Sequence, residues 1–187
     1  MFSNIRKSYG KYILKKRLKH FDRDKAVHNF ESAKTACILF QCTEDEDFSI
    51  IKSFKKHLEE HKIETYIIGY VEAKQVPDHF LLRRGFNCFC QSELSWNHIP
   101  SAPFLTEFLS KEFDMLFDLS LVTLFPVHYL VSMSKAQYKI GRFTDNTSYD
   151  LMIDIARENR LAYLCEQLKH YLGIIKSSRH TVREGSF

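Results

Sequence analysis

The residues best placed for chemistry in this sequence stand at the ends of its apolar runs. Open parallel sheets bind ligands outside the carboxyl ends of their strands, so polar side chains at such ends are the first candidates for a site. Asp118 and Asp154 each close an apolar run, and two such carboxylates could form an acid–base pair or hold Mg²⁺. In most proteins such carboxylates cap the helix or loop that follows. The catalytic candidates are Asp118, Ser120 and Asp154, and the candidates for lining a pocket are Thr43, Tyr70 and Arg142.

The turn that follows the first apolar run does not suit a phosphate. Its sequence from Gln41 to Asp47 is QCTEDED, which is acidic and contains no glycine. Such a turn repels a phosphate, whereas nucleotide-binding turns cradle it with glycine-rich backbone and a helix N-terminus. We therefore expect no dinucleotide site, no P-loop site and no cofactor.

One motif has metal-ligand spacing. His57-Leu-Glu-Glu-His61 fits the pattern of inverted zinc peptidases, with two histidines one helical turn apart. The motif lies within the charge run KKHLEEHK, which is typical of a solvated helix face. We expect such a face here, and no metal site.

The elements that must position the strand-end residues alternate between strands and helices. The run FDMLFD is apolar on both faces, so helices must cover the sheet on both sides. We expect an α/β fold: a three-layer, doubly wound, mostly parallel, Rossmann-like sheet of five or six strands in the order 3-2-1-4-5-6. A short loop precedes the last strand, which could therefore run antiparallel. The expected strands are 35–41, 63–71, 86–91, 114–120, 138–143 and 149–155, and the expected helices are 2–21, 43–62, 104–112, 123–136 and 157–176.

Local signals refine these elements. Thr43 and Glu46 have the spacing of a capping box at the start of the second helix. Asp114 and Asp150 begin strands, where they are expected to cap the chain or pair with basic residues. Residues 22–34 and 72–85 are expected to be polar connections.

The amino-terminal helix is set apart by its charge. Residues 1–25 contain nine Lys and Arg and two Asp, a net charge of +7, while the remaining chain carries −3. We therefore divide the chain into a basic N-terminal helix (1–25), a Rossmann-like domain (35–176) and a loose tail (177–187). Two apolar stripes could dock this helix: Phe2, Ile5, Tyr9, Tyr12 and Ile13 form one, and Leu14, Leu18 and Phe21 the other, with Gly10 at a possible bend.

The basic helix suggests an anionic partner. The simplest alternative is a solvated cationic face, but the charge exceeds what solubility requires. We expect docking on RNA or a ribosomal surface, with an anionic membrane surface second and a homo-oligomer formed through this helix third. The expected phosphate contacts are Arg6, Lys7, Lys11, Lys15, Lys16, Arg17 and Lys19.

The cysteines and the apolar runs bear on location. The five cysteines are an odd number and most lie within apolar runs, which favours free thiols in a reducing compartment. No signal peptide and no stretch of about 20 apolar residues is recognisable. We expect a cytoplasmic protein.

Several motifs resemble a known family. At FDMLFDLS, SKAQYKIGRF and YDLMIDIA, and at the strands CILF and IIGY, the chain resembles a family of uncharacterised cytosolic proteins from Bacteroidota, classed as a domain of unknown function. The resemblance implies a Rossmann-like body with a basic amino-terminal helix and brings no activity with it. The same motifs are similar, at the level of the fold, to the amino-terminal half of heptosyltransferase-type glycosyltransferases, which need a second, nucleotide-sugar-binding half.

Two functional hypotheses follow. The favoured one is a non-catalytic binding or adaptor protein that docks on an anionic partner through its cationic helix. The alternative is a small nucleotide- or sugar-dependent transferase with its site at the carboxyl edge of the sheet. A concave pocket at that edge would favour the transferase, and unpaired cations on the first helix would favour the adaptor.

Overall fold

The computed structural model describes residues 2–145 and 148–176. Its centre is one sheet in the order β3-β2-β1-β4-β5-β6, and every neighbouring pair is parallel. The predicted doubly wound fold and strand order are confirmed. The strands are β1 (Thr35–Gln41), β2 (Glu64–Val71), β3 (Asn87–Cys90), β4 (Met115–Asp118), β5 (Tyr138–Arg142) and β6 (Leu151–Ile153).

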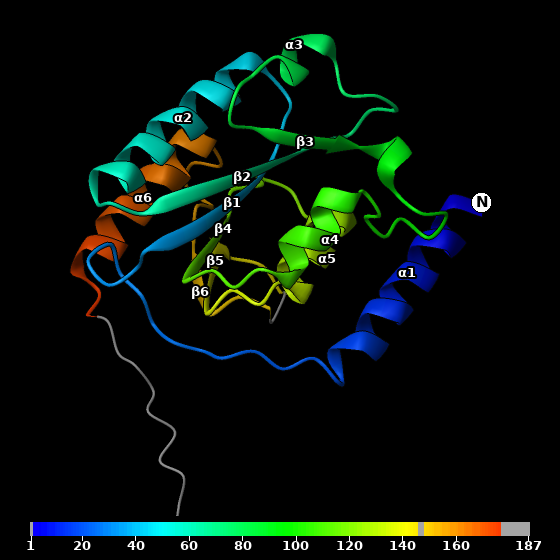
Figure 1. Ribbon diagram of the computed structural model, residues 1–187, viewed down its shortest axis with the longest axis horizontal. Helices are drawn as coiled ribbons and strands as arrows, with labels where there is room; N and C mark the ends of the chain where they lie inside the picture. The colour runs from blue at the N-terminus through cyan, green and yellow to red at the C-terminus, as the bar shows by residue number, and fades with distance from the viewer. Residues whose placement is uncertain (1, 146–147, 177–187) are drawn as a thin grey trace, which may run out of the picture.

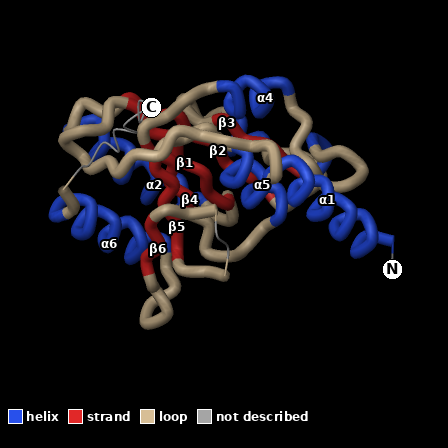
Figure 2. The backbone as a smooth tube through the Cα atoms, turned by 90° about the horizontal axis from the view of Figure 1, so that it is seen from below, coloured by secondary structure: helices blue, strands red, loops and turns tan. Residues whose placement is uncertain are grey.

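Helices cover both faces of the sheet, which makes three layers (Figure 1). On one face lie α2 (Asp45–Glu60) and α6 (Leu161–Ile174), and on the other lie α4 (Pro103–Ser110) and α5 (Phe125–Met133). Helix α1 (Phe2–Leu18) packs on the outer side of α5, away from the sheet (Figure 2). A single-turn helix, α3 (Asp78–Leu81), and a 3₁₀ turn, η1 (Gln91–Glu93), flank β3.

The apolar runs supply two cores because successive strand residues point to opposite faces. Ile38 and Phe117 are paired across β1 and β4 and contribute to the core beneath α2 and α6. Leu39 and Leu116 contribute to the core beneath α4 and α5. All four side chains are buried, which explains why these strands read as continuous apolar runs.

The antiparallel alternative for the last strand is wrong. β6 pairs with β5 in parallel, from Ile140 opposite Leu151 to Arg142 opposite Ile153. The eight residues between β5 and β6 are long enough to return along a five-residue strand. The Asp150 backbone N–H then donates to the Lys139 carbonyl at 2.8 Å, which fixes the parallel register.

The cap of α2 is shifted by one residue from the prediction. Glu44 is the N-cap and Asp47, not Glu46, completes the capping box. The Asp47 carboxylate accepts the backbone N–H groups of Thr43 and Glu44 at 2.9 and 3.0 Å and the Thr43 hydroxyl at 2.5 Å. The short aspartate side chain holds the turn before the helix, so Thr43 belongs to that turn.

The predicted linker 22–34 is fixed along the amino edge of the sheet. Arg23 donates to the carbonyls of Ala136 and Gln137 at 2.9 and 2.7 Å, and its other nitrogen binds both oxygens of Asp150 at 2.7 and 2.6 Å. Asp150 therefore pairs with a basic residue as expected. Further along, Phe30 and Ala33 are buried against the α2 and α6 core.

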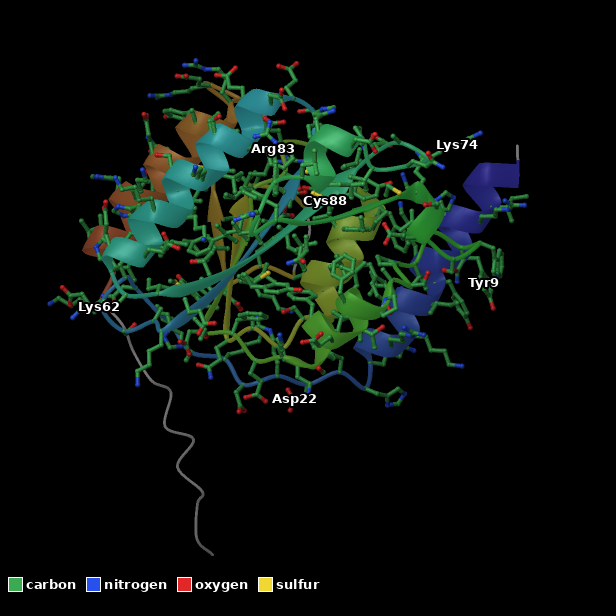
Figure 3. The ribbon with its side chains drawn as sticks, turned by 45° about the horizontal axis from the view of Figure 1, so that its top comes forward. Tyr9, Asp22, Lys62, Lys74, Arg83 and Cys88 are labelled. Atoms are coloured by element: carbon green, nitrogen blue, oxygen red, sulfur yellow. The ribbon has the colours of Figure 1, made fainter. Side chains whose placement is uncertain are left out.

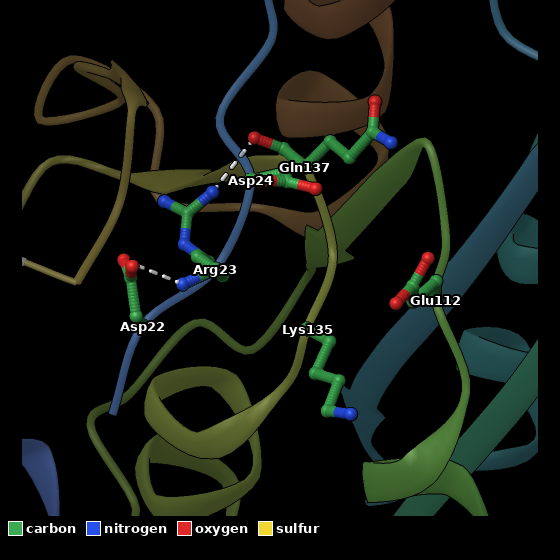
Figure 4. Close-up of a pocket in the computed structure, with 6 residues that line it drawn as sticks. All are labelled: Asp22, Arg23, Asp24, Glu112, Lys135 and Gln137. Atoms are coloured by element: carbon green, nitrogen blue, oxygen red, sulfur yellow. Dashed lines mark hydrogen bonds between the residues drawn. The ribbon is translucent and has the colours of Figure 1, made fainter. Parts of the chain in front are cut away.

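The same edge carries a polar pocket of about 200 Å³ (Figure 4). Its lining mixes acidic and basic groups, so it has no marked preference for one sign of charge. It lies at the amino ends of the strands, opposite the predicted site. The lining residues are Asp22, Arg23, Asp24, Glu112, Lys135 and Gln137.

Lys139 of β5 is a buried charge next to this linker. Only 2% of it is exposed; its Nζ donates to the Ser132 carbonyl at 3.1 Å and lies 5.4 Å from the centre of the Phe21 ring. Burial, with nearby Arg23 adding to its effect and Asp150 opposing it, lowers the pKa of Lys139 to about 7. The folded protein therefore releases this proton several pH units before the unfolded chain does.

Stability should depend on pH through this lysine. Between about pH 7 and pH 10 the unfolded chain binds more protons at Lys139 than the folded protein does, so stability rises with pH. In Lys139→Met this contribution is absent. We expect the variant to exceed the wild type in unfolding free energy at pH 7, and this advantage to shrink by up to about 1.4 kcal/mol per pH unit. Urea unfolding of both proteins at pH 7, 8 and 9 measures it, and a constant difference would contradict the assignment.

Candidate anion-binding surface

At the carboxyl edge of the sheet, the Asp118 carboxylate is hydrogen-bonded to neighbouring residues. Gly141 is opposite Asp118 in the next strand, and a Cβ at Gly141 would lie 2.6 Å from the Tyr149 ring. The missing side chain lets the Tyr149 ring cross β5 and donate its hydroxyl to Asp118 at 2.5 Å. The Ser120 backbone N–H donates to the other carboxylate oxygen at 3.0 Å. Burial raises the pKa of Asp118, and these hydrogen bonds oppose the rise.

This edge leaves little room for a substrate. Asp118, Ser120 and Arg142 converge there, and Arg142 donates to the Thr123 hydroxyl at 2.9 Å. The cavity between them has a volume of about 10 Å³. Such a space holds one water molecule at most. The side chains themselves therefore fill the crevice where doubly wound proteins usually bind ligands.

The other candidates from this edge lie apart. Asp154 is exposed after β6, where it accepts the Ala156 backbone N–H at 2.8 Å and so caps its own loop. β5 separates it from Asp118, so the two carboxylates do not form a pair. Tyr70 is buried, and burial raises its pKa to about 12. The Thr43 hydroxyl donates to Asp47 in the cap of α2.

The two histidines of the metal-like motif pack on the body. The rings of His57 and His61 lie 4.7 Å apart, and each is 5.0 Å from the Phe30 ring. Burial lowers the pKa of His57, and nearby His61 adds to the effect. Across the described ranges, no group of three or more His, Cys, Asp or Glu side chains is arranged to hold a metal ion.

Helix α1 docks through its second apolar stripe. Leu14 is buried, Leu18 is half-buried, and Arg17 donates to the Tyr129 hydroxyl. Gly10 lies in close contact with the body, because a Cβ there would lie 2.2 Å from the Asn97 carbonyl oxygen and 2.9 Å from Phe125, and α1 continues through it without a break. In the other stripe Ile5, Tyr9 and Tyr12 are exposed, whereas Ile13 is half-buried against the body.

The cations of α1 and the turn after it lie on the surface, and Arg17 alone among them has a side-chain partner, the Tyr129 hydroxyl, within the described residues. Arg6, Lys7, Lys11, Lys15, Lys16, Arg17 and Lys19 are all exposed. None of these side chains forms an ion pair with a residue that the structure describes. The three in the last helical turn complement the helix dipole, which accounts for part of the charge only.

Three lysines of this set line a groove beside α5. Lys7, Lys11 and Lys15 are spaced by one helical turn each, so they form a row along α1. The groove has a volume of about 500 Å³; His128 and the loop around Thr123 form its other wall. Asp145 is its one acidic lining residue within the described part of the chain. The geometry suits a chain of negative charges.

An aromatic cluster lies along the same helix. The rings of Tyr9 and Trp96 are stacked 5.1 Å apart, and Tyr12 lies 6.2 Å from Tyr9 (Figure 3 labels Tyr9). These three side chains are 45%, 62% and 62% exposed for Tyr9, Trp96 and Tyr12. Tyr9 and Tyr12 also line a second groove with Lys16. The sequence did not predict this cluster, because the spacing of the two tyrosines also fits an apolar stripe that packs a helix on the body. The loop that contains Trp96 was the signal that could have indicated a contact site.

The parallel sheet, its covered faces and the helix on its flank define a doubly wound α/β protein. The chain belongs to a family of unknown function (DUF6913), whose family model matches residues 6–175. The match begins inside α1, so it includes the cationic helix together with the sheet. Searches of curated proteins and of solved structures found no match. None of the helices in the described residues is long and apolar enough to cross a membrane.

Proposed function

We propose that this protein is a non-catalytic binding protein that docks on structured RNA, such as a ribosomal surface, through α1. The observation that carries the proposal is the row of exposed lysines that lines the groove between α1 and α5, on a helix that Leu14 and Leu18 hold to the body. Lysine and arginine side chains bind phosphates and release counterions, which drives sequence-independent RNA binding. A cytoplasmic location belongs to the same proposal.

The aromatic cluster favours RNA with unpaired bases. Tyr9, Tyr12 and Trp96 are exposed near the cation Lys16, and bases of loops and single strands stack on exposed aromatic rings. In a duplex the bases are paired and stacked on one another, so a duplex would contact the cations through its phosphates alone. We therefore expect loops or bulges to bind more tightly than a blunt duplex of equal length.

The membrane alternative is less well supported by the geometry. An interfacial helix inserts an apolar face between lipids. In α1 the aliphatic residues Leu14 and Leu18 pack on the body, which leaves Ile5 as the exposed aliphatic side chain among the described side chains of α1. The transferase alternative, and the heptosyltransferase likeness with it, would need a pocket at the carboxyl edge, where the cavity is about 10 Å³.

A direct comparison of three ligands tests the proposal. The intact protein is titrated at about 50 mM salt, where phosphate contacts are strong, with a stem-loop RNA, a blunt RNA duplex and anionic vesicles of phosphatidylserine and phosphatidylcholine. We expect affinity to be highest for the stem-loop and weakest for the vesicles. Vesicle binding stronger than RNA binding would replace the proposal with the membrane alternative, and no binding to any RNA would refute it.

A further inference from the structure

The groove between α1 and α5 reaches the carboxyl edge of the sheet at the start of α5 (Figure 2 shows the two helices side by side). Thr123, His128 and Thr144 line this groove and also line the small cavity at that edge, so the two spaces share a wall. The cavity has a volume of about 10 Å³, and Asp118 and Tyr149 line it as well. A chain that follows the lysine row therefore has room up to this wall but not beyond it.

The first turn of α5 has backbone donors without an acceptor in the helix. No side chain caps this helix, whose N-cap residue is Leu124. His128 is the first residue whose N–H donates within the turn, to the Leu124 carbonyl at 2.8 Å. Pro126 has no N–H, so the groups in question are the N–H groups of Phe125 and Val127. They lie at the positive end of the helix dipole, where anions bind.

A buried hydroxyl at the same place also lacks a partner. Ser120 is 3% exposed, and its Oγ forms no hydrogen bond with the residues that the structure describes. Burial raises the pKa of Asp118 and the nearby Ser120 hydroxyl opposes the rise, but the two groups are not in hydrogen-bonding geometry. Ser120 lines the small cavity together with Thr123 and Leu124 at the start of α5. A water molecule in this cavity would join the Ser120 hydroxyl to an anion in the groove.

Two cations stand at this wall of the groove. The terminal nitrogens of Arg142 donate to the Thr123 hydroxyl at 2.9 Å and to the carbonyl of the following residue at 3.3 Å, and Arg142 forms no ion pair with a described residue. Burial lowers the pKa of His128, and Lys11 adds to the effect, so Lys11 lies near the same wall. Asp145, an exposed acid that lines the groove, opposes them with one charge. The balance at this wall is positive.

We propose that the first turn of α5, with Thr123, Arg142 and Lys11, binds the terminal phosphate of an RNA strand whose backbone follows the lysine row. This site rests on the proposed function and adds to it a preference for a strand end. A terminal phosphate monoester carries about two negative charges and three free oxygens near neutral pH, whereas a phosphate within the strand carries one charge. The unpaired arginine, the free backbone donors and the closed end of the groove match the terminal group.

Three RNAs that differ only at their ends test this site. The intact protein is titrated at roughly 100 mM salt with one stem-loop that has single-stranded tails and carries a 5′-phosphate, a 3′-phosphate or two hydroxyl ends. We expect at least one phosphorylated form to bind about tenfold more tightly than the hydroxyl form, because a charge-assisted contact is added. Equal, salt-dependent affinity for all three overturns the site and leaves RNA docking through α1 in place. No binding of any form refutes the docking and the site with it.

Variants locate the preference at the start of α5. Arg142→Gln should reduce the tenfold preference to less than about twofold, and Thr123→Val should reduce it by about threefold, because one removes the charge and the other a hydroxyl. Arg157→Gln removes an exposed cation that follows β6 and should keep the full preference. Circular dichroism checks that each variant is folded. A preference that stays unchanged in both Arg142→Gln and Thr123→Val, or that Arg157→Gln lowers equally, overturns the site.

Discussion

Reversing four lysines of α1 to glutamate should lower the affinity for stem-loop RNA by about a hundredfold or more at roughly 100 mM salt. The chosen residues are Lys7, Lys11, Lys15 and Lys16, which are exposed and unpaired among the described residues. Each reversal removes one phosphate contact and adds one repulsion. Arg17 stays because it donates to the Tyr129 hydroxyl and helps to dock the helix. Fluorescence anisotropy with a labelled RNA measures the loss.

A matched variant separates local contacts from net charge. Lys34, Lys52, Lys56 and Arg157 are exposed cations outside α1, and their reversal changes the net charge by the same amount. We expect this control to weaken binding by less than about fivefold, because distant charges are screened at this salt concentration. An equal loss in both variants, or wild-type affinity in the α1 variant, would contradict the role of α1.

The second large effect concerns the docking of α1. Gly10→Ala places a Cβ where the Asn97 carbonyl oxygen and the Phe125 ring already lie. Because the closer obstacle is backbone, α1 must move away from the body, and we expect a loss of about 2 to 3 kcal/mol in unfolding free energy. Trp96, the only tryptophan, stacks on Tyr9, so its emission reports the docking of α1 directly.

A second helical glycine provides the control. No atom lies within 4 Å of the position that a Cβ would take at Gly173 in α6, so Gly173→Ala meets open space. We expect it to raise the unfolding free energy by about 0.5 to 1 kcal/mol, as for alanine in an exposed helix. Urea unfolding with Trp96 emission compares the two. Gly10→Ala with wild-type stability and emission would show that α1 does not pack as described.

Much of the fold could be predicted because buried parallel strands have a simple sequence pattern. The run FDMLFD must be covered on both faces, and it became β4 at the centre of the sheet. The direction of β6 could not be predicted, since it depends on where the chain after β5 turns back. The cap of α2 was predicted one residue too early because Glu46 and Asp47 both have acidic side chains. Only the position of each carboxylate relative to the backbone N–H groups of the turn distinguishes them.

The candidate site was harder to predict than the fold. The cations of α1 were found from charge alone, but the docking face depends on the shape of α5, which periodicity does not encode. Two stripes were left open as docking faces, and the burial of Leu14 shows that the second of them packs on the body.

The salt dependence of RNA affinity tests the central claim most directly. If the α1 cations bind phosphates, the logarithm of the affinity falls linearly with the logarithm of the salt concentration, with a slope of about −3 to −6. In the variant with Lys7, Lys11, Lys15 and Lys16 reversed, the slope should be shallower by about 3. Affinity that does not change with salt, or equal slopes for the wild type and the variant, would contradict RNA docking through this helix.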